Sequence, residues 1–197
     1  MACVESRLKM IPELETYQDQ LLSIKQDAEG LMSVLTDAQF NWRPAPGRWS
    51  IAECFDHLNT TARLFVPAID AAIANGRARE WRSQGPFVYP LFERIFLRLS
   101  EPPPRVRFRA PAAFRPPATR AADDIRREFM DWQEKLGARL VHADGLDLCR
   151  ARHRSPAIGI FRWSLGTMFA VMLAHQRRHI WQARKVLGQP GFPGKAP

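Results

Sequence analysis

The sequence contains few cysteines, and their spacing suggests no pair. Cys3, Cys54 and Cys149 are odd in number, lie far apart along the chain, and lack the C-x-x-C spacing of zinc knuckles and redox-active thiol pairs. The cysteine pattern therefore argues against both of those protein classes. It predicts three reduced thiols.

Long apolar runs are absent as well. A membrane-spanning helix needs about 18 or more consecutive apolar residues, and no stretch of the 197 residues approaches that length. The first residues, MACVESRLKMIPELE, also lack the apolar segment of a secretory signal. We therefore expect a cytoplasmic protein that does not enter a membrane.

Acidic residues are outnumbered: 29 Lys and Arg face 20 Asp and Glu, which gives a net charge of +9 at pH 7. Such an excess favours anionic partners, which include nucleic acid, an anionic membrane surface and a small carboxylate or phosphate substrate. The aromatic residues mostly fall on apolar stripes instead of among the arginines, and no helix-turn-helix or zinc-finger spacing is present. The sequence thus argues against nucleic acid and leaves a small-molecule substrate as the expected partner.

The chain shows no internal repeat and no alternation of strand and helix patterns. What it does show is four amphipathic stripes, the first of which repeats apolar residues every three or four positions from Leu14 to Leu35. An antiparallel four-helix bundle is the simplest all-α fold that buries four such stripes in one domain, residues 1–197. The expected helices span about residues 10–36, 50–75, 119–142 and 164–187.

Local signals mark the ends of these helices. Ser50 and Glu53 have the spacing of a capping box, and Thr119 has the character of an N-cap for the third helix. Pro67 predicts a kink near the end of the second helix, and Gly188, followed by Pro190, predicts a C′ glycine at the end of the fourth.

Two segments break the helical pattern. Residues 77–118 form a Pro/Arg-rich insertion, in which residues 90–99 are a short helix candidate and the proline-rich residues 101–117 are expected to be extended. A second irregular segment covers residues 146–162, before the last helix.

The last helix carries two histidines on its core stripe. His175 and His179 are four residues apart, which places their Cβ atoms roughly 5–6 Å from each other on one face. A buried imidazole without a partner costs roughly 1–3 kcal/mol for each unmet polar group, and a metal ion bound by the neutral nitrogens removes that cost. His57, on the second helix, is the candidate third ligand. The alternative stays open that H-x-x-x-H is a chance pattern of core histidines.

Two further polar residues are candidates for orienting groups or for proton transfer, Asp56 and Gln182. Asp56 has an equally simple interpretation as a solvated helix residue. Glu53 lies one turn before His57, but the capping box already accounts for it, so we do not expect it to be catalytic.

Arginines alternate with other residues in RVRFR, residues 105–109, and in RARHR, residues 150–154. In an extended chain this spacing puts the arginines on one side, where Arg150 and Arg152 could bind a substrate carboxylate or another anion. The alternative is a solvated surface edge, which is the usual role of a run of charges.

Two segments carry a family resemblance. LTDAQFNWRPAPGRWSIAECFDHL resembles the signature of the DinB/YfiT-like family, in which a W-S pair precedes the second helix and a histidine follows within two turns. LAHQRRHIWQARKVLGQPGFP resembles the C-terminal H-x-x-x-H helix of the same family. Residues 77–117 do not align with the family.

The resemblance implies an all-α four-helix bundle, a divalent zinc, nickel or iron ion on His57, His175 and His179, and a homodimer. Some members of the family use a low-molecular-weight thiol as co-substrate for S-transfer or isomerisation. The first hypothesis is therefore a metal-dependent enzyme acting on a small molecule, either a thiol-dependent transferase or a related hydrolase. The alternatives are a basic nucleic-acid-binding protein and a bundle whose metal is only structural.

Overall fold

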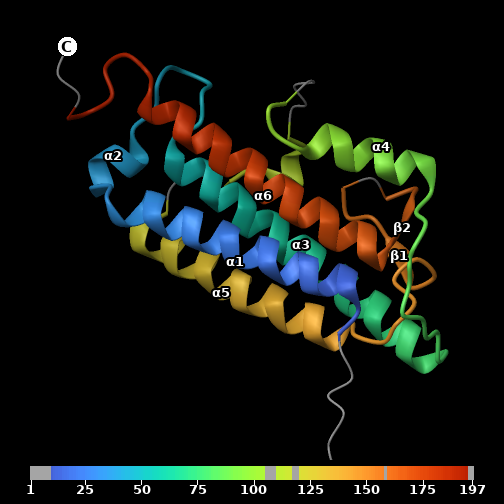
Figure 1. Ribbon diagram of the computed structural model, residues 1–197. Helices are drawn as coiled ribbons and strands as arrows, with labels where there is room; N and C mark the ends of the chain where they lie inside the picture. The colour runs from blue at the N-terminus through green and yellow to red at the C-terminus, as the bar shows by residue number, and fades with distance from the viewer. Residues whose placement is uncertain (1–9, 105–109, 117–119, 158, 195–197) are drawn as a thin grey trace, which may run out of the picture.

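Four long helices lie side by side in the computed structural model, which describes residues 10–104, 110–116, 120–157 and 159–194 (Figure 1). They are α1 (Pro12–Ser33), α3 (Ile51–Ala78), α5 (Ala122–His142) and α6 (Leu165–Leu187). The expected all-α bundle is therefore confirmed. Three features of the sequence analysis lie outside the described residues: Cys3, Thr119 and residues 105–109.

The helices run two in each direction. Arg184 of α6 reaches Asp27 and Arg177 reaches Gln20, so α1 and α6 run parallel. Arg139 of α5 pairs with Asp70 of α3. Nearer the start of α5, Glu128 pairs with Arg63 of α3. These two pairs show that α3 and α5 run parallel. Helices α3 and α6 are antiparallel, as Figure 1 shows. Helices α1 and α6 thus run opposite to α3 and α5, because the connection between α3 and α5 brings the chain back to the end of the bundle where α3 began.

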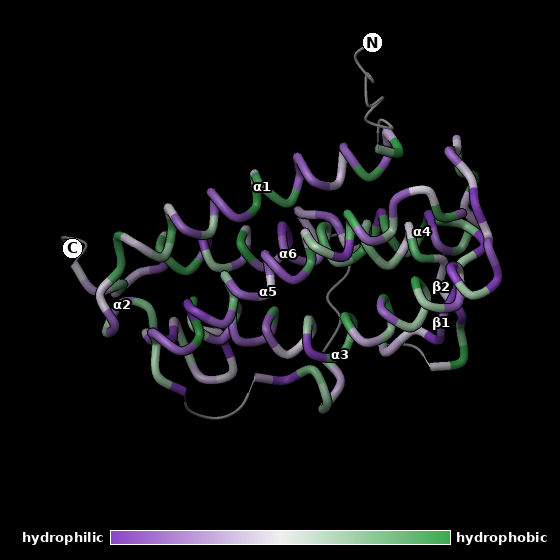
Figure 2. Tube along the Cα trace, turned by 90° about the horizontal axis from the view of Figure 1, so that it is seen from below, coloured by the Kyte–Doolittle hydropathy of each residue, from purple (hydrophilic) through white to green (hydrophobic). Residues whose placement is uncertain are grey.

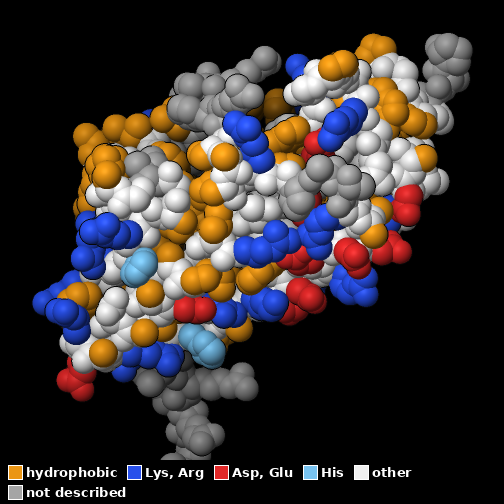
Figure 3. All heavy atoms as spheres, turned by 180° about the vertical axis from the view of Figure 1, so that it is seen from behind, with side chains coloured by type: hydrophobic (Ala, Val, Ile, Leu, Met, Phe, Trp, Pro, Cys, Tyr) orange, Lys and Arg blue, Asp and Glu red, His pale blue; other side chains and the backbone are white. Residues whose placement is uncertain are grey.

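Each long helix buries one apolar stripe between its neighbours. Figure 2 shows the alternation of hydrophilic and hydrophobic positions along α1, and the apolar stripe from Leu14 to Leu31 is buried as expected. Aromatic rings pack together where the short helix Asp37–Asn41, the start of α3 and the start of α5 meet, and there Phe55 contacts both Phe40 and Phe129 at ring-centroid distances of 6.0 and 5.0 Å. On the face shown in Figure 3, Lys and Arg side chains are spread among hydrophobic and acidic ones. None of the described helices combines the length and the apolar character needed to cross a membrane.

The helix ends agree with the sequence signals in part. The capping box is confirmed, because Ser50 Oγ accepts from the Glu53 amide at 3.1 Å and the Glu53 carboxylate accepts from the Ser50 amide at 2.9 Å. Helix α3 continues past Pro67 and past the expected end near residue 75. Gly188 is the C-cap of α6 with φ of −84°, so it does not have the left-handed conformation of a C′ glycine.

A short helix between α1 and α3 was not expected from the sequence. It is α2 (Asp37–Asn41), whose capping box joins Thr36 and Gln39. Helix α2 and the loop after it contact residues that follow α6. Gln39 Nε2 donates to the Pro193 carbonyl at 3.0 Å, and the Trp42 and Phe192 rings lie 5.5 Å apart. This loop therefore lies beside the C-terminal end of α6.

The insertion is partly helical and packs on α6. It contains α4 (Leu91–Ser100), close to the helix candidate at residues 90–99, and the single 3-10 turn η1 (Ala112–Phe114). Glu93 of α4 is 1% exposed and accepts hydrogen bonds from Ser164, Thr167 and Arg152. Because Ser164 is also the N-cap of α6, this buried carboxylate ties the insertion to the start of that helix.

The segment before α6 contains a two-stranded antiparallel sheet. Strands β1 (Arg152–Arg154) and β2 (Arg162–Ser164) pair with Arg152 opposite Ser164. Trp163 of β2 is 1% exposed and packs against Phe65 of α3 and Phe96 of α4. The irregular segment of the sequence analysis thus includes a small hairpin that closes one end of the bundle.

Candidate metal centre

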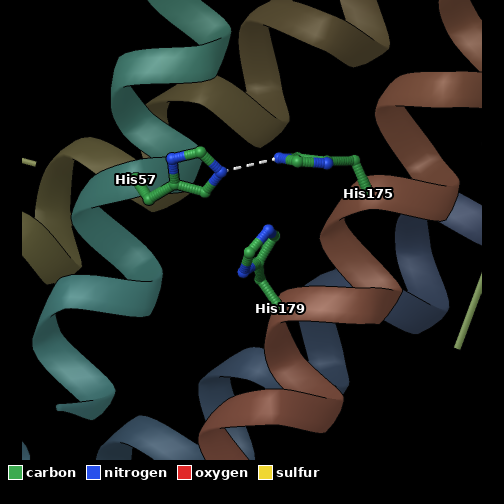
Figure 4. A group of neighbouring side chains, drawn as sticks. All are labelled: His57, His175 and His179. Carbon is green, nitrogen blue, oxygen red and sulfur yellow. Dashed lines mark hydrogen bonds between the residues drawn. The ribbon is translucent and has the colours of Figure 1, made fainter. Parts of the chain in front are cut away.

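The three histidines singled out by the sequence meet between α3 and α6. Figure 4 shows the His57, His175 and His179 rings converging on one point, and one potential ligand atom from each lies within 4.8 Å of the others. His57 Nε2 and His175 Nε2 are 2.9 Å apart. Two nitrogens bound to one metal at about 2.0–2.1 Å are separated by about 3 Å, so the spacing suits a shared ion.

Helix packing explains why the rings meet. His175 and His179 lie one turn apart on the face of α6 that contacts α3, and His57 projects from α3 between the core residues Cys54 and Leu58. His57 is 3% exposed and His179 is 8% exposed, whereas His175 is only partly buried. The predicted triad is therefore brought together, with one ring closer to the solvent side.

His57 is oriented by the insertion. Its Nδ1 lies 2.5 Å from the carbonyl oxygen of Phe114, in η1, so Nδ1–H donates to that carbonyl. In the neutral ring this leaves the lone pair on Nε2, the atom aimed at the other two histidines. A metal ion between the rings would take the place of the proton that His175 Nε2 otherwise needs for a hydrogen bond to His57 Nε2.

One polar atom of the triad remains unsatisfied. His179 Nδ1 is buried and has no hydrogen-bond partner among the described residues. A buried polar atom in that condition costs about 1–3 kcal/mol. Independently of that atom, the donor set fits a divalent metal ion, because three neutral imidazoles are ligands of the kind that bind zinc, nickel or iron.

Burial keeps these imidazoles neutral. It lowers the pKa of His57, although the Phe114 carbonyl acts in the opposite direction. Burial also lowers the pKa of His175 and of His179 well below the usual value, and the neighbouring histidines and Arg178 lower both further. The neutral ring is the form that binds metal, so all three are in the ligand form at neutral pH.

Trp49 packs on the triad from the loop before α3. Its ring lies 4.9 Å from the His57 ring and 5.8 Å from the His179 ring, measured between centroids. An indole in this place limits the motion of both imidazoles and excludes water from one side of them. In the sequence the W-S pair before α3 indicates only the start of a helix, and it is also the available signal for this contact.

The triad faces a cavity of about 1150 Å³. Ligand pockets typically measure about 300–1000 Å³, so the space is sufficient for a small molecule together with water. All three histidines line the cavity, and so do Phe96, Leu99 and Phe114 of the insertion. The insertion therefore contributes to the site, which its lack of alignment with the family did not reveal.

The two candidate orienting residues lie in different places. Gln182, one turn beyond His179, lines the cavity, and its side chain opposes the lowering of the His179 pKa. Asp56 is 2% exposed but turns to the other side of α3, where its carboxylate lies 2.7 Å from Arg120. A catalytic role for either residue stays a prediction, and only Gln182 has the location for it.

Arg150 and Arg152 are not brought to the triad. The Arg150 guanidinium lies over the Trp81 ring at 4.8 Å, and Arg152 pairs at 2.8 Å with the buried Glu93 carboxylate. Neither residue lines the cavity. Their predicted contact with substrate stays a prediction, whereas the cations that do line the cavity include Arg48, Arg115 and Lys185.

Comparison with known proteins adds one finding. A family model described as the DinB superfamily matches residues 20–183, which include all three histidines and the whole insertion. Searches among curated proteins and among solved structures gave no match.

Proposed function

This chain belongs to the DinB superfamily, and from that premise we propose that it is a metal-dependent enzyme acting on a small molecule. The first candidate reaction is transfer to or from the sulfur of a low-molecular-weight thiol, and the second is hydrolysis. The single observation that carries the proposal is a triad of neutral histidines on the wall of a large cavity.

The number of ligands supports a catalytic site over a structural one. Structural zinc sites are closed by four protein ligands, whereas catalytic sites keep three and leave a position open. Among the described residues, the cluster of potential ligands consists of His57, His175 and His179 alone. His175 is also only partly buried, which leaves the triad accessible from the cavity.

A divalent metal held by three neutral imidazoles supplies a Lewis acid with open coordination positions, which suits both candidate reactions. Residues of the protein orient and shield the ligands. The Phe114 carbonyl holds a proton on His57 Nδ1, and Trp49 shields the rings on one side. Gln182 supplies an amide beside the triad that can orient a polar group of the substrate.

The preference for a thiol-dependent transferase comes from the family resemblance of the two motifs, and the cavity supports a small-molecule substrate of either kind. A homodimer and a cytoplasmic location are part of the same proposal. Light scattering on the purified protein tests the first of these, with twice the mass of the 22.6 kDa chain as the expected result.

The deciding experiment is elemental analysis of the untagged protein beside a His175→Ala/His179→Ala variant. We expect about one divalent metal per wild-type chain and none in the variant. The metal-loaded protein is then assayed for thiol conjugation and for hydrolysis. A metal whose removal lowers only the melting temperature, with no turnover in either assay, would identify a structural site and end the proposal.

A further inference from the structure

The cavity changes character along its length, on either side of the triad. Because α3 and α6 are antiparallel, the residues that line the cavity follow one another in opposite order along the two helices. They are Glu53, His57, Thr61 and Phe65 from α3, and Lys185, His179, His175 and Met172 from α6. The triad lies in the middle of this series. From Met172 to Lys185 the rise of the helix is about 20 Å.

One end is aromatic and apolar. Phe65, Phe96 and Trp163 all line the cavity there, and the Trp163 ring lies 6.0 Å from Phe65 and 4.7 Å from Phe96. Phe114 adds a further ring 6.3 Å from Phe65. Leu99, Val171 and Met172 extend this apolar surface, and Arg178, which also lines the cavity, donates to the Leu99 carbonyl at 3.0 Å. Such a wall binds hydrocarbon or aryl groups by removing apolar surface from water.

The other end is basic. Arg43 and Arg48, in the loop before α3, line the cavity together with Lys185 in the last turn of α6. Glu53 is the one acidic residue among the described residues that line it, and Arg43 holds both of its oxygens, at 2.9 and 2.7 Å. Arg48 and Lys185 are exposed and remain to attract an anion.

We infer that this cavity takes a small amphipathic anion, with its apolar body against Phe65, Phe96 and Trp163 and its carboxylate or phosphate toward Arg48 and Lys185. The inference rests on the proposed function for one point only, that the bond to be changed lies at the triad between the two ends. The polarity of the cavity itself is independent of any metal.

Binding of matched probes tests the basic end. Isothermal titration calorimetry compares 6-phenylhexanoate with its neutral counterpart 6-phenylhexanamide, using metal-loaded protein and protein treated with EDTA. We expect the anion to bind about tenfold more tightly than the amide. The variant Arg48→Gln/Lys185→Gln should lose about five- to tenfold in affinity for the anion only, since two partly exposed charges are removed.

The matched control is Arg94→Gln/Arg98→Gln, which removes two exposed arginines of α4 that do not line the cavity. We expect less than a twofold change, because solvent screens charges beyond about 10 Å. Equal losses in both double variants, or equal binding of anion and amide, would overturn the inference. So would binding that disappears with EDTA but is indifferent to Arg48 and Lys185, because the carboxylate would then bind the metal.

A second pair of probes and one further variant test the apolar end of the cavity. Hexanoate, which lacks the ring, should bind at least tenfold more weakly than 6-phenylhexanoate, and Leu99→Gln should weaken the phenyl probe about threefold without affecting hexanoate. A Leu99→Gln variant that weakens both probes equally would contradict the placement of the apolar body. Elemental analysis of each sample separates these outcomes from a failure of the proposed metal site.

Discussion

Two neighbouring residues of α3, Asp56 and His57, lie on different sides of the helix, and the polar groups around them differ in how fully they are hydrogen-bonded. Asp56 turns toward α5, where Arg120 lies 2.7 Å and Arg63 lies 3.9 Å from its carboxylate. His57 turns toward α6, where the triad leaves His179 Nδ1 without a hydrogen-bond partner among the described residues. The Asp56 carboxylate therefore finds its partners within the protein, whereas the triad does not satisfy all of its own polar atoms.

This difference indicates on which side of α3 a bound ion is expected. On the α5 side, Glu128 closes a network of carboxylates and guanidiniums by pairing with both Arg63 and Arg120 at 2.7 Å. On the α6 side three imidazoles meet, which cannot neutralise one another and which burial keeps uncharged. Three neutral imidazoles around one point are the donor set that a divalent metal takes, so the triad is where we expect a bound ion.

The largest effect should follow from removing a ligand of the triad. His57→Ala should weaken zinc or nickel binding by more than about 100-fold, since loss even of an outer partner of a ligand costs 10–100-fold. A chelator-competition titration measures this. Thr61→Val is the matched control one turn along α3: it also lines the cavity, and we expect less than a twofold change. Equal affinities in wild type and His57→Ala would place the metal elsewhere.

Removing the ion pair between Arg120 and Asp56 should lower the stability of the fold without changing the affinity for metal. Arg120→Ala should lower the free energy of unfolding by about 2 kcal/mol, less than the 3–5 kcal/mol typical of a broken buried pair, because Arg63 remains close to Asp56. Urea denaturation measures the change. Arg127→Ala removes an exposed pair with Asp124 and should cost under about 0.5 kcal/mol. Loss of metal from Arg120→Ala would contradict the separation of the two interfaces.

The insertion should influence metal binding through His57. Phe114→Ala removes the buried ring that holds the η1 carbonyl against His57 Nδ1, and we expect about a tenfold loss of metal affinity, again by chelator competition. Phe92→Ala, which removes an exposed ring of the same insertion, serves as the control. If both substitutions leave the affinity unchanged, η1 does not orient the ligand.

The smallest effect concerns pH. Partial burial alone would raise the pKa of Glu128, but hydrogen bonds from Arg63, Arg120 and Trp132 outweigh it and lower the pKa to about 2. The resulting stabilisation is present above the unfolded pKa of about 4.5 and is lost as the pH falls from there toward 2. Solvent screening keeps it under about 1 kcal/mol.

Urea midpoints measured at pH 7 and pH 3 test this sign. Glu128→Gln should be less stable than wild type at pH 7, and the gap should narrow at pH 3, where the wild-type carboxyl is largely protonated in the unfolded chain but still mostly ionised in the folded protein. A gap that widens on acidification would show that the guanidiniums do not stabilise this carboxylate.

The sequence predicted what depends on local pattern. Apolar residues at helical spacing identified the four long helices, the Ser50 and Glu53 pair identified the start of α3, and His175 and His179 on a core stripe identified the ligand helix. Each of these signals is contained within a few turns, so it does not depend on how distant segments pack.

Other features depend on contacts between distant segments. Nothing near Asp56 in the sequence shows that Arg120 pairs with it, and a backbone carbonyl such as that of Phe114 carries no sequence signal at all. Helix α2 is only five residues long, too short for a periodic stripe. The return of the chain along the bundle follows from residues 79–121, whose prolines and arginines have no period that would indicate a packed face.

The buried Glu93 carboxylate has a consequence for protein engineering. It joins α4 to Ser164, the cap of the helix that carries two of the three ligands, and to Arg152 of the hairpin. A chimera that exchanged residues 79–121 for the equivalent stretch of a relative would leave Ser164 and Arg152 without their acceptor unless the graft brought its own carboxylate to the same place. A graft that lacks this carboxylate therefore needs the α4 segment, the hairpin and the start of α6 to be exchanged together.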